Sequence, residues 1–401
     1  MVRPERRRKA DVAAVVLIAL AVVVASVVVW AGSDARATIS EPAAHPAPDV
    51  PPTTSVPAAL HEMWRARSPA TPVPVVAGPA VVTGAGNEVL GRDPVTGQVR
   101  WRYARDIPLC TIGTAWDRAL AVFRKEHNCS EITSLRGDSG LRGPQRNADA
   151  EFGTRLLSDG TYVTATGREA VESWRSDLVR TQQFGIPPAL KNPGNNLKRP
   201  GCEYLSVAAS DERVGLVEQC PREQGERITL IKTRPEDDEK PEEIFSTGLG
   251  STGATVVAVS KKRAAVLTAD RSELVVFDNS AAVVGTFPVR AAAPAGDANA
   301  RVAATSKDGL VHWHTGVDTV ALDPANLTPV WTAPDTLGPG TIFGERMIVP
   351  VPEGLAVLDP KTGARERVIP VDRQGYSGPV QLDSVGDVLV EQRGTELVAL
   401  R

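Results

Sequence analysis

Four cysteines are the residues of this sequence whose type and spacing suggest the most specific chemistry, which is disulfide formation. Cys110 and Cys129 lie 19 positions apart, and Cys202 and Cys220 lie 18 apart. Each pair flanks a segment that reads as a β-hairpin, and matching ends of adjacent antiparallel strands are close enough to be bridged. Four cysteines allow three connectivities, and we expect the local pairing within each hairpin. The alternative is a single zinc site built from all four thiolates.

Three other groups of residues suggest ligand binding. His312 and His314 can share one face of a strand and bind a metal, although no third ligand is indicated. The sequence favours two polar residues there, with Trp313 in the core. The acidic run 235–243 has the charge for calcium, but two prolines and no glycine favour a solvated turn. The insertion 185–201 is a candidate contact surface, because long loops often carry function.

The motifs of several large enzyme classes are missing from the sequence. It contains no G-x-S-x-G, H-E-x-x-H, C-x-x-C or P-loop pattern, and no G-x-G-x-x-G between a strand and a helix. We therefore expect no catalytic, cofactor-binding or metal-binding residues. The net charge is -3 and the first nine residues carry +4, so the rest carries -7 and nucleic acid is not an expected partner.

An apolar segment near the start indicates a membrane anchor. Residues 12–31 contain one polar side chain, Ser26, and twenty residues suffice for a helix to cross a bilayer. The basic tail, residues 1–11, places the N-terminus in the cytoplasm by the positive-inside rule and the remainder outside it. The alternative is a signal peptide cleaved near residues 35–37, but the apolar segment is longer than such peptides have.

The next segment has the composition of a linker. Residues 32–60 are rich in proline and alanine and nearly devoid of large apolar side chains. Such a segment is stiff and extended, and we expect it to act as a spacer that lifts the following domain off the membrane.

A repeated hairpin follows the linker. Three segments share a β-run that ends in Asp-Pro, turns and resumes, at Asp93, Asp323 and Asp359. Aspartate and proline suit the first positions of a β-turn, because aspartate accepts nearby backbone N–H groups and proline fixes φ. Trp101 stands eight residues after Asp93, and Trp331 stands eight residues after Asp323. The identical spacing predicts one repeated structural unit.

The repeat predicts an all-β fold, an eight-bladed β-propeller over residues 61–401, with seven blades as the alternative count. A period near forty residues with four short strands is typical of a propeller blade. The turn positions that mark the eight units are Asp93, Arg136, Arg175, Lys232, Asp278, Asp323, Asp359 and Arg401. The last unit lacks a final strand, and the segment around Trp64 is expected to supply it. Pairing the two ends of the chain would remove two exposed sheet edges.

These turns carry parts of the pattern Leu-Asp-Pro-x-Thr-Gly followed by a tryptophan, which resembles the pyrroloquinoline-quinone repeat of β-propeller proteins. This resemblance covers roughly residues 60–401 and is strongest at Asp93, Asp323 and Asp359. The family includes quinoprotein alcohol dehydrogenases and a lipoprotein scaffold of outer-membrane assembly. Its quinoproteins hold their cofactor against two adjacent cysteines, and this sequence has none. The resemblance therefore implies the fold without the redox cofactor.

The expected function is that of a membrane-anchored, extracytoplasmic scaffold that binds envelope or membrane proteins and is not an enzyme. The two alternatives are a quinoprotein-like oxidoreductase and a ligand-binding or sensor propeller for carbohydrate or peptide. The expected location is the cell membrane, with a single crossing, a cytoplasmic N-terminus and the propeller outside the cytoplasm.

Overall fold

The computed structural model describes residues 8–33, 36–187, 199–237, 240–292, 305–307 and 309–401. Parts of four sequence features lie outside these residues: the start of the basic tail (1–7), two positions of the linker (34–35), most of the insertion (188–198) and the centre of the acidic run (238–239).

One long helix precedes the β structure. Helix α1 (Lys9–Ala31) begins three residues before the expected apolar segment and ends with it. Its side chains are all exposed, and an 18-residue window has a mean hydropathy of 3.2. It is the one helix in the described residues that is long and apolar enough to cross a membrane.

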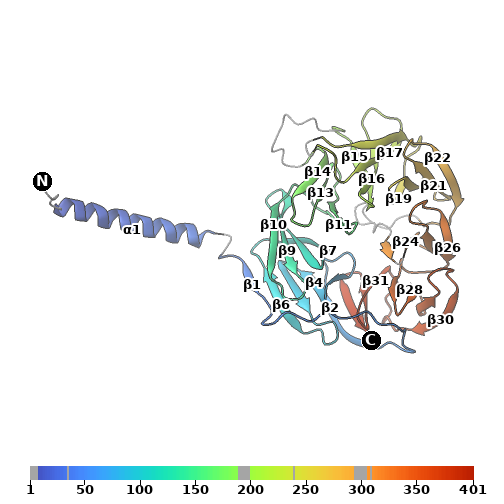
Figure 1. The fold of residues 1–401 in the computed structure, drawn as a ribbon, viewed down its shortest axis with the longest axis horizontal. Helices are drawn as coiled ribbons and strands as arrows, with labels where there is room; N and C mark the ends of the chain where they lie inside the picture. Colours follow the sequence, from blue (N-terminus) through green and yellow to red (C-terminus); the bar gives the residue numbers. More distant parts are fainter. Residues whose placement is uncertain (1–7, 34–35, 188–198, 238–239, 293–304, 308) are drawn as a thin grey trace.

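The remaining elements form a ring of eight sheets, which confirms the eight-bladed β-propeller (Figure 1). The first two blades consist of β3 (Val75–Ala77), β4 (Ala80–Ala85), β5 (Glu88–Arg92), β6 (Val99–Ala104), β7 (Leu109–Ala115), β8 (Arg118–Lys125), β9 (Asn128–Arg136) and β10 (Arg142–Asn147). The third and fourth consist of β11 (Leu156–Ser158), β12 (Val163–Ala165), β13 (Ala170–Trp174), β14 (Arg180–Gly185), β15 (Glu203–Ser210), β16 (Arg213–Gln219), β17 (Glu226–Lys232) and β18 (Glu243–Gly248).

The second half of the ring has the same design. The fifth and sixth blades consist of β19 (Thr255–Val259), β20 (Arg263–Leu267), β21 (Glu273–Asp278), β22 (Val283–Pro288), β23 (Thr305–Lys307), β24 (Leu310–His314), β25 (Thr319–Leu322) and β26 (Pro329–Ala333). The seventh and eighth consist of β27 (Thr341–Phe343), β28 (Arg346–Val351), β29 (Gly354–Leu358), β30 (Arg365–Pro370), β31 (Val380–Val385), β32 (Val388–Arg393), β33 (Glu396–Leu400) and β2 (Glu62–Arg67).

Strand β2 closes the ring, as the sequence predicts. It pairs antiparallel with β33 and so supplies the outermost strand of the eighth blade. The first strands of the blades surround the axis and contact one another in six of the eight neighbouring pairs, and the fourth strands form the rim. Each of the eight predicted turn positions lies at the end of the third strand of its blade. The period near forty residues is therefore the period of the blades.

The hydrophobic core lies between the blades rather than at the centre of the ring. Eight clusters of buried side chains occur in the described residues, and each joins two consecutive blades. Both faces of the inner strands are covered, so β32, for example, is buried along its whole length. Continuous apolar runs are typical of strands that are buried on both faces.

Three tryptophans each form a hydrogen bond from one blade to the next. Trp64 donates its indole N–H to the carbonyl of Pro94, Trp101 to that of Gly137 and Trp331 to that of Pro360, at 2.8, 2.8 and 3.0 Å. Each acceptor follows a predicted turn position of the next blade by one residue. At two of these three joints the indole of one blade therefore bonds to the Asp-Pro turn of the next blade.

The aspartates that open these turns have the role that the sequence predicts. The carboxylate of Asp93 accepts backbone N–H groups of Val95 and Thr96, and Asp323 and Asp359 accept the equivalent pairs. These bonds fix the three turns, and the turns at Asp93 and Asp359 are the ones on which Trp64 and Trp331 rest.

The expectation that residues 32–60 form a free spacer is wrong. Strand β1 (Ile39–Glu41) pairs with β6 as a fifth strand of the first blade. Residues 43–57, here called the strap, then cross the face of the ring that carries the turns 93–98 and 136–141 (the turn face). The backbone of the strap is bonded to this face at Ala43, Ala47 and Thr53. Proline-rich composition gave an extended segment, but one that binds the domain instead of lifting it.

Candidate functional site

The first disulfide has the predicted pairing but joins different strands from those expected. Cys110 on β7 and Cys129 on β9 are bonded, with Cα atoms 6.2 Å apart. Strand β8 lies between β7 and β9, so the two strands are not adjacent. The pairing of β8 is irregular on both sides at this end, once opposite Cys110 and once between Phe123 and Lys125. A β-bulge redirects side chains, which lets the two sulfur atoms meet over the end of β8.

The second disulfide agrees fully with the prediction. Cys202 directly precedes β15 and Cys220 directly follows β16, and these strands are adjacent. Because the two pairs are disulfides in different blades, the alternative zinc site with four thiolates is wrong. Glu218 lies beside the second bridge, and burial raises the pKa of its carboxyl group. The hydroxyl of Thr229 donates to this carboxyl group at 2.5 Å, and the guanidinium of Arg199 lies 3.4 Å from it.

The surroundings of His312 and His314 are those of residues with a structural role. His312 is 1% exposed and its ring lies 5.7 Å from that of Trp331. His314 shares a hydrogen bond of 3.0 Å with the carbonyl of Thr336, and burial lowers the pKa of its imidazole. Trp313 is buried between the fifth and sixth blades, as predicted.

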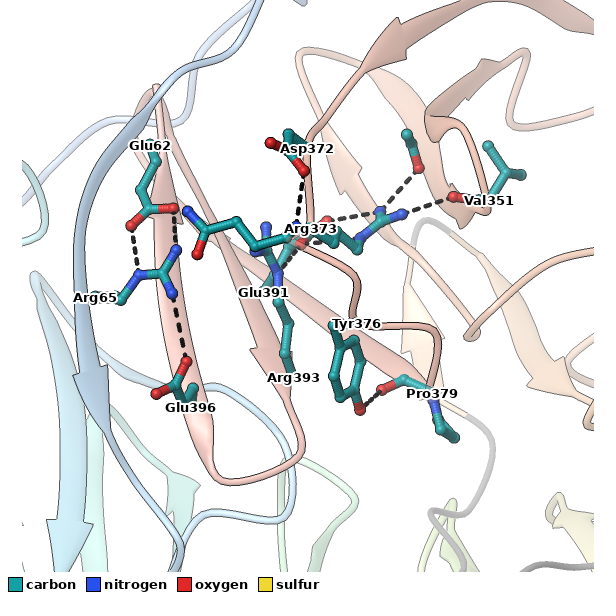
Figure 2. A network of polar contacts seen from close by, with 12 residues as sticks. Glu62, Arg65, Val351, Asp372, Arg373, Tyr376, Pro379, Glu391, Arg393 and Glu396 are labelled. Carbon is teal, nitrogen blue, oxygen red and sulfur yellow. Dashed lines mark hydrogen bonds and ion pairs between the residues drawn. The ribbon is translucent and has the colours of Figure 1, made fainter.

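A buried network of charges joins the seventh and eighth blades (Figure 2). The carboxylate of Glu391 accepts hydrogen bonds from Arg373, at 2.9 and 3.2 Å, and from Arg393, at 2.7 Å. Arg373 also donates to the carbonyls of Val351 and Gly354 in the seventh blade. All three charged side chains are at most 5% exposed. The network is therefore enclosed and holds the connection between two blades.

A polar cleft of about 590 Å³ opens on the turn face beneath the strap. The strap provides Asp49 and Val50 as one wall, and turns of the first two blades provide the other. The residues of those turns that line the cleft are Gly78, Pro79, Trp116, Asp117, Arg118, Arg136 and Asp138. Volumes of this size are typical of small-molecule sites.

The walls of the cleft are held by close backbone contacts. The N–H of Gly137 donates to the carbonyl of Asp117, which ties two turns of the second blade together. A side chain at Gly137 would collide with the carbonyl of Ala77, so the first two blades approach closely here. The strap is fixed by the bond from the Ala47 N–H to the carbonyl of Asp138. The shape of the cleft is therefore built into the ring.

Two charged side chains of the cleft, Arg136 and Asp138, neutralise each other. The guanidinium of Arg136 donates to Asp138 at 3.1 and 2.5 Å. This hydrogen bonding lowers the pKa of the Asp138 carboxyl group, and the Ser139 hydroxyl assists it. Asp49 and Asp117 also line the cleft and are exposed.

Sequence reasoning missed most of this site. Arg136 was singled out only as a turn position, and Trp116 and Asp117 fall inside the segment between the cysteines of the first pair. Asp49 lies in the linker, which composition alone presents as featureless. The one available signal was a tryptophan at a hairpin turn, where small polar residues are the rule.

Comparisons with known proteins give the fold and nothing more specific. No family model and no curated protein matches the sequence. Among solved structures, BamB from Moraxella catarrhalis is similar to this chain with a TM-score of 0.51 and 13% identity, over 85% of this chain and 99% of that one. Saccharomyces cerevisiae Sqt1 is similar at a TM-score of 0.48 and 10% identity, over 87% and 99% of the two chains.

A quinohemoprotein alcohol dehydrogenase of Pseudomonas putida is a third similar structure. Its TM-score is 0.47 and its identity 11%, over 85% of this chain and 76% of that one. At these identities the likeness shows the architecture alone. The chain is therefore an eight-bladed β-propeller similar in fold to BamB, preceded by an apolar helix.

Proposed function

We propose that this protein is a single-pass membrane protein whose propeller lies outside the cytoplasm and serves as a non-catalytic scaffold for other envelope proteins. One observation carries the proposal: the ring is tethered at its first blade and has uncharged outer strands, β22 and β26, in the fifth and sixth blades, on the far side of the ring (Figure 1). The tether holds the ring near the membrane and leaves that side available to a partner.

The tether is short. Residues 32–38 separate the end of α1 from β1, which is paired with β6. Seven residues span at most about 25 Å when fully extended. A membrane-embedded α1 would therefore hold the outer edge of the first blade close to the membrane surface.

The orientation rests on two independent arguments. Arg6, Arg7, Arg8 and Lys9 precede the apolar segment, and basic residues remain on the cytoplasmic side. Disulfides persist in oxidising compartments outside the cytoplasm, and all four cysteines are paired. Both arguments support a propeller on the outer side of the membrane.

The contact surface that we propose is the rim of the fifth and sixth blades. Val283, Val284 and Val330 are 57%, 48% and 48% exposed on β22 and β26. The outer strands of the other six blades each contain at least one charged residue, whereas β22 and β26 contain none. Charges on an edge strand oppose pairing with another chain, so their absence favours a protein contact.

In-cell photo-crosslinking tests the scaffold function. A photoreactive residue at Val284 is expected to give one discrete adduct, which a second substitution, Val330→Lys, weakens. The same residue at Gln145, on the outer strand of the second blade, serves as the matched control. Adducts of equal yield and identity at both positions, or none at Val284, would contradict the proposal.

Topology and enzyme activity need separate tests. A reporter enzyme that is active only outside the cytoplasm, fused after Arg401, is expected to be active, and removing the charges of Arg6, Arg7, Arg8 and Lys9 is expected to lower its activity. Stoichiometric binding of pyrroloquinoline quinone with calcium, accompanied by dye reduction, would favour the quinoprotein-like oxidoreductase instead.

A further inference from the structure

We infer that the cleft beneath the strap is a binding site for a neutral carbohydrate, with Trp116 as the surface on which a sugar ring stacks. This inference is independent of the scaffold function, because the cleft lies on the turn face and the proposed protein contact lies on the rim.

The backbone at Trp116 is the first observation. Trp116 and Asp117 both have left-handed φ values, 54° and 57°. Such values are rare for a bulky residue, and they favour glycine or asparagine. The same turn of the fourth blade has Asp211 and Glu212 at φ 50° and 59°, so the turn itself does not require a tryptophan. The chain thus holds a large aromatic side chain at a strained position beside a cleft.

The side chain of Trp116 is the second observation. It is half-buried against the cluster between the second and third blades and lines the cleft. In the described part of the chain its indole N–H has no protein acceptor, unlike the indoles of Trp64, Trp101 and Trp331. An indole offers an apolar surface and one hydrogen-bond donor.

The polar groups around this indole complete the argument. Asp49 and Asp117 form no ion pair or side-chain hydrogen bond with described residues, so their carboxylates can accept bonds from a ligand. Among the described residues Arg118 has one hydrogen bond, of 3.4 Å to the carbonyl of Ser176, so most of its donors remain available. A ligand that fits must therefore both donate and accept hydrogen bonds.

The net charge of the cleft indicates which class of ligand it can bind. Arg136 and Asp138 neutralise each other, and Arg118 balances one of the two remaining carboxylates. The cleft is left with a single negative charge, which disfavours an anion. A pyranose ring is neutral, has a C–H face for the indole, and carries hydroxyl groups that both donate and accept. Neutral oligosaccharides meet all of these requirements.

The test is titration calorimetry of the full chain with maltotriose, cellotriose and chitotriose as probes. The protein is held in nanodiscs, because detergents with sugar head groups would compete. At least one trisaccharide is expected to bind with a Kd of about 1 mM or tighter. Trp116→Gly is expected to weaken this binding at least about tenfold, and Asp117→Asn and Asp49→Asn at least about threefold.

Asp211→Gly is the matched control, since it relieves the same backbone strain in the fourth blade. This variant is expected to bind the trisaccharide as tightly as the unmodified protein does. If Trp116→Gly fails to fold, the two exposed carboxylate variants still test the site. Three results would each overturn the inference. The first is that none of the three sugars binds at about 20 mM, and the second is that all three cleft variants bind as tightly as the unmodified protein. The third is that a short lysine peptide binds while no sugar does.

Discussion

The indole N–H of Trp64, on the N-terminal strand β2, donates a hydrogen bond of 2.8 Å to the carbonyl of Pro94 in the first blade. The same strand pairs with β33 at the C-terminal end of the chain. Two segments more than 300 residues apart are therefore joined in one blade, and the Trp64 side chain links that blade to the next, beside the hydrophobic cluster that the two blades share. The integrity of the ring depends on this joint.

Substitution of Gly97 tests the contact between Trp64 and the turn of the first blade. A Cβ on Gly97 would lie 2.6 Å from Cγ of Trp64, and its φ is 71°. Gly86 has a similar φ of 64° but nothing within 4 Å of the corresponding Cβ, so Gly86→Ala reports the backbone effect alone. We expect Gly97→Ala to lower the free energy of unfolding by at least about 1 kcal/mol more than Gly86→Ala does. Equal losses in chemical denaturation would mean that the indole does not rest on this turn.

The buried charge network predicts that replacing Glu391 lowers the free energy of unfolding far more than replacing Glu62 does (Figure 2). Glu391→Gln leaves Arg373 and Arg393 enclosed without a counter-charge, which typically costs about 3–5 kcal/mol. Glu62→Gln breaks an ion pair with Arg65 that is about one-third exposed, and such pairs contribute less than about 1 kcal/mol. Denaturant unfolding of the two variants measures this difference. A loss at Glu62 as large as that at Glu391 would contradict the enclosure of the network.

A buried carboxyl group predicts a pH-dependent stability. Burial raises the pKa of Glu172, which is 3% exposed. Above the ordinary pKa of glutamate the unfolded chain has released this proton while the folded chain still holds it. Stability is therefore lost as pH rises from that ordinary value through the raised pKa. Glu172→Gln removes this loss, so its melting temperature relative to the parent should be higher at pH 7.5 than at pH 4.

Glu169→Gln is the exposed control for this experiment, and we expect it to change the melting temperature little at either pH. A Glu172→Gln variant that is relatively less stable at pH 7.5 than at pH 4 would show that attraction to Arg146, at 3.9 Å, outweighs burial.

The disulfides predict the behaviour of the thiols. Denatured, unreduced protein should have no free thiol, and digestion should release the peptides Cys110–Cys129 and Cys202–Cys220. Replacing either pair by serines should lower the free energy of unfolding by roughly 3 kcal/mol in the chain-entropy model, because the two loops are of nearly equal length. A peptide that links Cys129 to Cys202 would contradict the local pairing.

Local chemistry made much of this fold predictable. The turns at Asp93, Asp323 and Asp359 are specified by residues within three positions, so the eight-unit period can be found in the sequence. The missing final strand and its replacement near Trp64 follow from counting strands.

Contacts between distant segments were harder to predict. The strap binds mainly through backbone groups, for example from Ala47 to the carbonyl of Asp138, and such bonds leave no side-chain pattern. The bulges that bring Cys110 over the end of β8 are likewise invisible in the alternation of residues. The cleft depends on both kinds of contact, which is why Trp116 and Asp49 were not identified beforehand.

Thermal unfolding of chains shortened at the N-terminus tests most directly the central claim that this end completes the ring. A chain that begins at Ala37 retains β1, the strap and β2; one that begins at Pro57 retains only β2; one that begins at Val73 retains none. We expect a modest decrease in melting temperature from Ala37 to Pro57, because the strap and β1 are bonded to the ring.

A much larger decrease, or aggregation, is expected from Pro57 to Val73. That step exposes the edge of β33 and removes the indole of Trp64, whose loss costs about 2–4 kcal/mol for a half-buried tryptophan. Trp64→Ala in the Pro57 chain should reproduce much of that decrease. Equal melting temperatures for the Pro57 and Val73 chains would show that the ring closes without its N-terminal strand and would contradict the account.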